Sequence, residues 1–134
     1  MSIASGASGA GGALVSARKT TESARWLAAL VENSSDSIIG VDDRGILQSW
    51  NAGAQRLFGY TPAEMIGRRG DVLIPAGRTD ELEEVLGDGE QFIDSFRFET
   101  ERVRKDGTLV EVAITASRVR DEDGNALGWA LVAR

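Results

Sequence analysis

The order of hydrophobic and polar residues predicts one helix ahead of a mostly β region. Residues 2–12 are almost entirely Ser, Ala and Gly, a composition that cannot form a core, so we interpret 1–18 as a flexible lead. From 19 to 34 the pattern becomes that of an amphipathic helix, because apolar residues gather on one face. They are Trp26, Leu27, Leu30 and Val31. This face must be buried, either on the sheet of the same chain or on a partner.

Strand-type alternation dominates the rest of the chain, the predicted core domain of 35–134. Two short runs, 37–41 and 46–50, flank the turn Asp42-Asp43-Arg44-Gly45, which is typical of a β-hairpin. Three longer runs follow, separated by turns rich in Asp and Gly; they cover 91–104, 109–119 and 126–134. One face of the first of them carries Phe92, Phe96, Phe98, Thr100 and Arg102.

Between the hairpin and the later strands the sequence predicts two very short helices. Asn51 is a suitable N-cap, and Gly59 suits the left-handed position that ends a helix. The stretch Thr61-Pro62-Ala63-Glu64 is a capping box with proline at the first helical position, and we expect Met65 and Ile66 to pack inward after it. Helices this short are not stable alone, so tertiary contacts must hold them.

A third short helix is predicted over 78–86. The element order is then a helix, a hairpin, three short helices and a three-stranded meander. Strands at both ends with helices between them imply one antiparallel sheet covered by helices on one face, an α+β fold.

Composition narrows the function classes. The chain of 134 residues has no cysteine and no histidine, which removes thiolate chemistry, the commonest metal ligand and the usual general base. A net charge of -6 argues against nucleic-acid binding. No apolar run is long enough to span a bilayer and no signal peptide is visible, so we expect a cytoplasmic location, without membrane contact. No nucleophile and base pair is apparent, so we expect no enzymatic activity.

The chain resembles the PAS domain family over roughly 24–134. The resemblance rests on four stretches in the right order and spacing: "DSIIGVDDRGILQSWN", "AGAQRLFGYTPAEMIG", "RVRKDGTLVEV" and "RDEDGNALGWALVAR". It implies a five-stranded antiparallel sheet of order 2-1-5-4-3, with helices that enclose a small pocket. It also implies a sensor or dimerisation module beside a C-terminal output domain, which this sequence does not include.

The resemblance argues against the best-known cofactors of the family. Flavin-binding photosensory relatives keep a reactive cysteine, two asparagines and a glutamine where this chain has Gly70, Arg102, Val112 and Ala133, so covalent flavin chemistry is not expected, while non-covalent FAD stays open. Haem is usually held by histidine, and Met65 is better interpreted as a core residue than as an iron ligand. The cofactor is therefore unknown.

Acidic clusters and aromatic residues have structural interpretations as well as functional ones. Asp42-Asp43 and Asp121-Glu122-Asp123 lie in predicted turns, Glu83-Glu84 lies on a predicted helix surface, and none has calcium-loop spacing. The aromatic residues, Trp50 among them, form either plain core or a ligand pocket. The residues that we expect near a pocket are Leu57, Phe58, Ile74, Phe98, Thr100, Arg102, Val112, Ile114, Trp129 and Leu131.

Two functions remain open from the sequence. One is a sensor that binds a small molecule or partner and signals to the output domain; the other is a ligand-free dimerisation or interaction module. We expect a homodimer through the stripe of Trp26, Leu27, Leu30 and Val31. Arg102 either meets an anionic ligand in the pocket or reaches solvent or a neighbour such as Glu101 or Glu111. From the resemblance, Glu64 and Lys105 are expected to pair.

Overall fold

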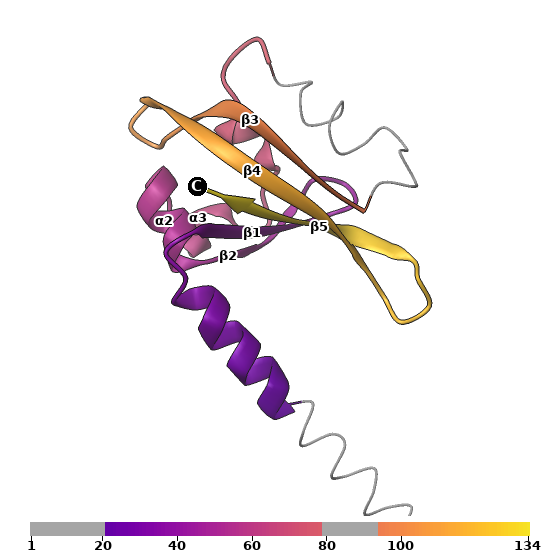
Figure 1. Cartoon of the computed structure of the whole chain (residues 1–134). Coiled ribbons are helices and arrows are strands. Elements are labelled where there is room, and N and C mark those ends of the chain that lie inside the picture. The colour runs from indigo at the N-terminus through magenta and orange to yellow at the C-terminus, as the bar shows by residue number, and fades with distance from the viewer. Residues whose placement is uncertain (1–20, 79–93) are drawn as a thin grey trace, which may run out of the picture. The chain divides into compact units, whose positions relative to one another are not determined.

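The computed structural model describes residues 21–78 and 94–134. The chain forms two compact units, Met1–Glu32 and Asn33–Arg134. In the first unit residues 21–32 are helical, as their apolar periodicity predicts. The second unit contains, in chain order, β1 (Ser37–Asp42), β2 (Leu47–Trp50), α2 (Ala52–Phe58), α3 (Pro62–Met65), the 3-10 helix η1 (Gly70–Leu73), β3 (Ser95–Val103), β4 (Leu109–Arg120) and β5 (Ala126–Ala133) (Figure 1).

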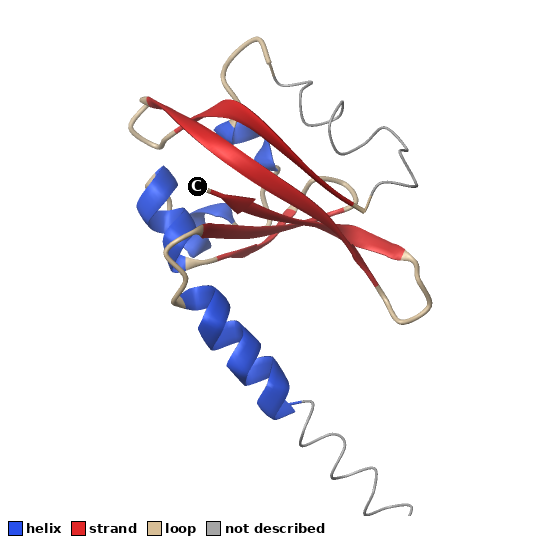
Figure 2. Ribbon diagram, viewed as in Figure 1, coloured by secondary structure: helices blue, strands red, loops and turns tan. Residues whose placement is uncertain are grey.

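The five strands form one antiparallel sheet of order β2-β1-β5-β4-β3, which confirms the expected order. The first strand pairs with the last, so that Ile39 lies opposite Leu131, and the two longest strands place Phe98 opposite Ile114. Directly opposed residues project to the same face of a sheet, so these apolar residues share its inner face. The short helices α2, α3 and η1 cover this face (Figure 2).

The predicted caps explain where α2 and α3 begin and end. The Asn51 side chain accepts a hydrogen bond from the backbone N–H of Ala54, and Gly59 ends α2 at a φ of 88°. In α3 both bonds of the capping box are present, between Thr61 and Glu64. Each cap satisfies N–H groups that a helix of one or two turns cannot satisfy itself.

The core lies between the sheet and the short helices. Its largest fully buried side chains include Phe58, Leu47 and Met65. The expectation that Ile66 packs inward beside Met65 is wrong, because 48% of Ile66 is exposed. The helix ends at Met65, and Ile66 has extended backbone angles, so the helical periodicity no longer sets its direction.

Three further predictions meet the structure differently. The helix predicted over 78–86 and the start of the strand predicted from 91 lie outside the described residues, apart from Arg78, which is not helical. The 3-10 helix η1 was not predicted, since its four residues show no apolar period. Within 21–78 and 94–134, no helix has both the length and the apolar character needed to cross a membrane.

Candidate functional site

A small cavity lies between the sheet and the short helices. Its volume is about 50 Å³. Its walls come from the inner faces of the strands, the end of α2 and the region of η1. The residues that line it are Ile39, Val41, Leu47, Phe58, Gly70, Leu73, Ile74, Phe98, Arg102, Ile114, Leu131 and Ala133. All but one of these described lining residues are uncharged and apolar.

The exception is Arg102, whose side chain is buried with only 6% of the residue exposed. Its Nη1 donates hydrogen bonds to Thr100 Oγ1 at 3.3 Å and to the backbone carbonyl of Glu101 at 2.9 Å. The Glu101 carboxylate pairs at 3.0 Å with Arg78. Arg102 is therefore buried rather than extended to solvent, and its permanent positive charge lies among lining residues that, in the described part of the chain, are otherwise apolar.

The structure brings together six of the ten residues expected near a pocket. The six that line the cavity are Phe58, Ile74, Phe98, Arg102, Ile114 and Leu131. Val112 and Leu57 lie in the adjoining core, and Val112 and Thr100 also border a separate polar hollow at the edge strand. Trp129 packs edge-on against Phe96, with ring centroids 5.5 Å apart.

The sequence analysis missed several lining residues of the first hairpin and of the 3-10 helix η1. Ile39, Val41 and Leu47 project from β1 and β2, where the alternating pattern marked only a core face. Gly70 and Ala133 also line the cavity. A signal for these two was present, because the resemblance placed them at positions that hold flavin in photosensory relatives.

The turn between β3 and β4 holds the cavity wall formed by α2. Arg104 Nε donates to the carbonyl of Leu57 at 3.1 Å, and the backbone N–H of Lys105 donates to the carbonyl of Phe58 at 2.8 Å. These donors satisfy carbonyls at the C-terminal end of α2, where positive charge is also favourable. The turn therefore holds the end of α2 in place.

The same turn also holds α3 through the expected ion pair. Lys105 Nζ lies 2.6 Å from Glu64 Oε2, which confirms the predicted pairing. The hydrogen bond from Lys105, together with the backbone N–H of Thr61, lowers the pKa of the Glu64 carboxyl to about 2. Both partners are substantially exposed, so the pair positions α3 more than it stabilises the fold.

A second attachment joins the beginning of α2 to the beginning of β1. Asn51 Oδ1 accepts from the backbone N–H groups of Ile38 and Ala54, each at 2.9 Å, and Asn51 Nδ2 donates to the carbonyl of Asp36 at 3.0 Å. The Asp36 carboxylate in turn pairs with Arg134 at 3.2 Å. The segment that enters the sheet is thus fixed to α2 and to the last residue of the chain.

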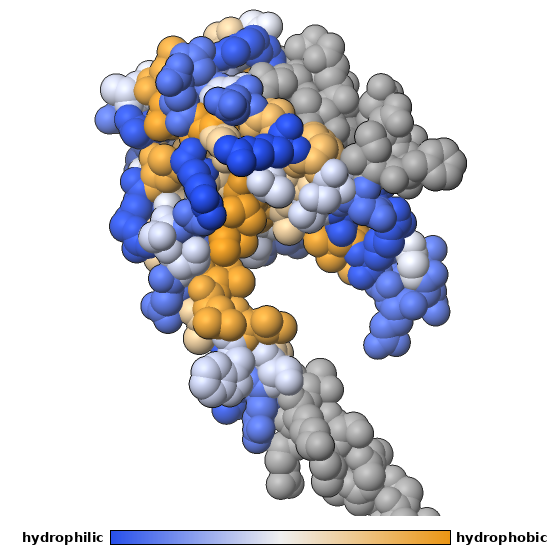
Figure 3. Space-filling view, viewed as in Figure 1, coloured by the Kyte–Doolittle hydropathy of each residue, from blue (hydrophilic) through white to orange (hydrophobic). Residues whose placement is uncertain are grey.

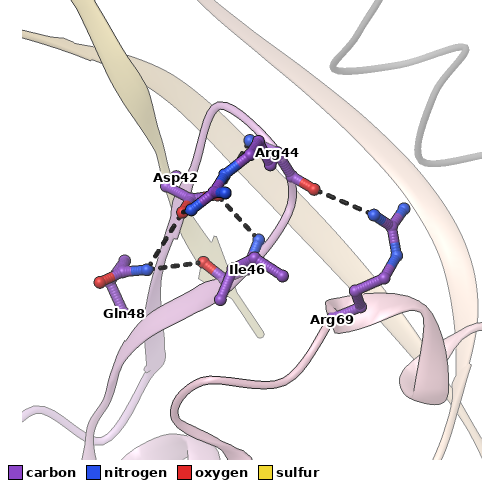
Figure 4. A network of polar contacts seen from close by, with 5 residues as sticks. All are labelled: Asp42, Arg44, Ile46, Gln48 and Arg69. Carbon is purple, nitrogen blue, oxygen red and sulfur yellow. Dashed lines mark hydrogen bonds and ion pairs between the residues drawn. The ribbon is translucent and has the colours of Figure 1, made fainter.

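The acidic turns have a structural role. In Figure 4, Asp42 Oδ1 accepts from the backbone N–H groups of Arg44 and Ile46 at 2.9 Å, and Arg69 donates to the Arg44 carbonyl at 3.2 Å. The Ile46 N–H is the main cause of the lowered pKa of Asp42. Within the part of the chain that the structure describes, no three acidic, His or Cys side chains are grouped to hold a metal ion.

The helical segment 21–32 carries an exposed apolar stripe. Trp26, Leu27 and Leu30 are 72%, 62% and 64% exposed, and Val31 is half-buried. Figure 3 shows apolar atoms gathered along this helix. The four residues of this stripe are therefore exposed or half-buried as described, and the burial expected for them stays a prediction.

These features define an α+β domain in which one antiparallel sheet and short capped helices enclose a small cavity. Residues 35–134 match the family model described as PAS domain, and the chain belongs to this family. PAS domains are common sensor and signalling modules.

Solved structures agree with this assignment. The PAS domain of a protein from Colwellia psychrerythraea is 21% identical, with 82% of this chain and 93% of that chain covered and a TM-score of 0.76. The PAS domain of an HTR-like protein from Haloarcula marismortui is 24% identical, with coverages of 87% and 94% and a TM-score of 0.73. A third is the PAS domain, in complex with ethanol, of a LuxR-family transcriptional regulator from Burkholderia thailandensis, at 18% identity, coverages of 80% and 94% and a TM-score of 0.64. At these identities the likeness concerns the fold.

Proposed function

We propose that this PAS domain is a non-enzymatic sensor that binds a small molecule in the cavity and relays binding to an output domain outside this sequence. One observation carries the proposal: a single buried cation, Arg102, lies in an otherwise apolar cavity among the described lining residues. Ligand sites combine mostly apolar walls with a few polar groups that orient the ligand. The cytoplasmic location expected from the sequence remains a prediction.

The size of the cavity favours a very small ligand. One water molecule needs roughly 10–15 Å³ of cavity volume. A cavity of about 50 Å³ therefore has room for about three to five non-hydrogen atoms. Drug-sized ligands and flavins require several hundred Å³, which would need a displacement of the walls. The ethanol complex of the Burkholderia thailandensis PAS domain supports the idea that this fold accommodates molecules of that size.

The contacts that hold α2 and α3 in place support the proposal that ligand binding is transmitted to an output domain. The helices α2 and α3 are too short to be stable by themselves, so their positions depend on the contacts at Asn51 and at the Arg104–Lys105 turn. A ligand that shifts Phe58 at the end of α2 would act on both attachments. One of them includes Asp36, close to the start of the core, and Arg134 at its end.

Native mass spectrometry of protein purified from cells tests the proposal. We expect a bound small mass in the wild type and in Ala130→Leu, but not in Ala133→Leu, which fills the cavity. Both alanines lie on β5, but of the two only Ala133 lines the cavity. Ala130→Leu is therefore a matched control for Ala133→Leu. Two results together would refute the sensor proposal. The wild type carries no bound mass, and small molecules added to the protein bind to Ala133→Leu as well as they bind to the wild type.

The exposed stripe supports a second candidate, a ligand-free dimerisation or interaction module. A self-complementary apolar helix face is suited to a symmetric pair of identical chains, and we propose homodimerisation through Trp26, Leu27, Leu30 and Val31. Light scattering should show a dimer that Trp26→Ala with Leu30→Ala converts to a monomer. Arg25→Ala with Glu32→Ala, on the opposite side of the helix, keeps the net charge and should remain dimeric. A monomeric wild type refutes this assembly.

A further inference from the structure

We infer that the ligand of the cavity is a small uncharged apolar molecule, in the class of a short hydrocarbon, with about four non-hydrogen atoms. This inference rests on the proposed function and adds the chemical class of the ligand. Two features of the cavity carry it: the chemistry of its walls and its volume.

The walls of the cavity consist mostly of aliphatic and aromatic carbon. Of the twelve described residues that line it, ten have apolar side chains and one is glycine. They come from all five strands, from the end of α2 and from the segment around η1, so apolar surface faces the cavity from several sides. Each apolar group that a ligand buries against this surface gains free energy.

Water and polar ligands compete poorly for a site of this kind. A buried water molecule needs two to four polar partners, and an apolar cavity without them stays dry. A ligand with a charge or an amide group would lose its own hydration, and the ten apolar side chains offer no hydrogen bond in return. An uncharged apolar molecule has no such cost.

An apolar ligand needs no hydrogen-bond donor from Arg102. The Nη1 group of Arg102 already donates to Thr100 Oγ1 at 3.3 Å and to the backbone carbonyl of Glu101 at 2.9 Å. These bonds can stay in place when the cavity is filled. The methylene groups of a long cationic side chain also pack well against apolar surface.

Four molecules of one shape separate the effect of polarity from the effect of size. Isobutene, acetone, acetamide and acetate each have four non-hydrogen atoms in the same planar, three-armed arrangement. A ligand of this size has a Kd no lower than roughly 40 µM, so each is titrated into the millimolar range at constant ionic strength. Isobutene should bind most tightly. Acetamide should bind at least about tenfold more weakly, with acetone between them, and acetate should not bind.

The isoleucine methyl groups report where each molecule binds. Ile39, Ile74 and Ile114 line the cavity. Ile38 is next to Ile39 but on the opposite face of β1, and Ile66 is 48% exposed. In NMR spectra of protein with labelled isoleucine methyl groups, isobutene should shift the signals of the three cavity residues and leave those of Ile38 and Ile66 in place.

Two substitutions at the cavity wall test this location. Ala133→Leu should abolish the shifts, whereas Ala130→Leu on the same strand should keep them. Gly70→Ala is a milder variant if Ala133→Leu does not fold. Its added Cβ would lie 3.8 Å from Leu47 Cδ2 and 4.0 Å from the Gly45 carbonyl oxygen, both ordinary contact distances. One more methyl group at the wall of so small a cavity should weaken isobutene binding severalfold.

The outcomes distinguish the ligand class from the proposed function. If acetamide or acetate shifts the cavity signals as readily as isobutene does, the apolar class is wrong and the proposed function stands. If isobutene still binds with wild-type affinity to both Ala133→Leu and Gly70→Ala, it binds elsewhere and the inference is also wrong. If none of the four molecules shifts the signals, the apolar class fails; a bound mass in native mass spectrometry would then keep the proposed function, and its absence would overturn both.

Discussion

Asn51 offers the strongest test of how the cavity wall is fastened to the sheet. Its side chain, which is 2% exposed, joins three backbone groups from two elements: the N–H groups of Ile38 and Ala54 and the carbonyl of Asp36. Asn51→Ala removes all three bonds without adding bulk. We expect a large loss of stability from a single polar substitution at the edge of the core.

The magnitude follows from the separate bonds. Loss of the N-cap of α2 costs about 1 kcal/mol. Ile38 N–H and the Asp36 carbonyl are partly buried, and a buried polar group without its partner costs about 1–3 kcal/mol. The sum is about 3–7 kcal/mol, a large share of the roughly 5–15 kcal/mol that stabilises a domain. Asn51→Ser retains a capping oxygen and should lose about 1 kcal/mol less than Asn51→Ala.

Urea unfolding followed by tryptophan fluorescence measures these differences. Thr61→Ala is the matched control, because it removes only an exposed cap and should cost about 1 kcal/mol. The m-value should stay constant, so that a shift in midpoint reports stability. If Asn51→Ala costs no more than Thr61→Ala, the two bonds to the β1 segment contribute nothing and the reasoning is refuted.

Three further substitutions have outcomes that the geometry decides. Gly53→Ala should destabilise by about 1–3 kcal/mol in urea, although alanine normally favours a helix, because its Cβ would lie 2.1 Å from the Asp36 carbonyl oxygen; a gain in stability would contradict this. Glu64 has a folded pKa of about 2 against 4.5 ordinarily, so the stability that its pair with Lys105 contributes is present above pH 4.5 and is lost as the pH falls towards 2. The Tm difference between wild type and Glu64→Gln should shrink over that range, and a constant difference would exclude the linkage. Ser37→Ala should leave Tm unchanged or raise it, because the buried Ser37 hydroxyl has no hydrogen-bond partner among the described residues; a clear loss would reveal a partner.

Local chemistry explains why much of the fold is predictable from the sequence. The caps at Asn51 and Thr61 and the turn at Asp42 each depend on residues within five positions of one another, and all three form as expected. Strand faces follow from alternation, which placed Phe98 and Arg102 on the inner face of β3. These signals need no knowledge of distant contacts.

The cavity is less predictable because it depends on how distant elements pack. Alternation shows that Ile39, Val41 and Leu47 face inward, but whether an inward side chain meets another side chain or a void depends on the volumes of all its neighbours. Ile66 shows the same limit in reverse. It is apolar and next to the buried Met65, yet the end of α3 turns it outward.

Arg102 shows most clearly what tertiary structure adds to the pattern. Its position on the inner face was expected, but a long cationic side chain one residue from the end of a strand can often extend to water. Whether Arg102 reaches water depends on the segment that covers it. Gly70, Leu73 and Ile74, about thirty residues away in the chain, line the same cavity from η1 and its end. Because η1 has no periodic signal, neither the burial of this charge nor the polarity of the cavity follows from β3 alone. The burial of this arginine therefore depends on the segment around η1 as well as on β3.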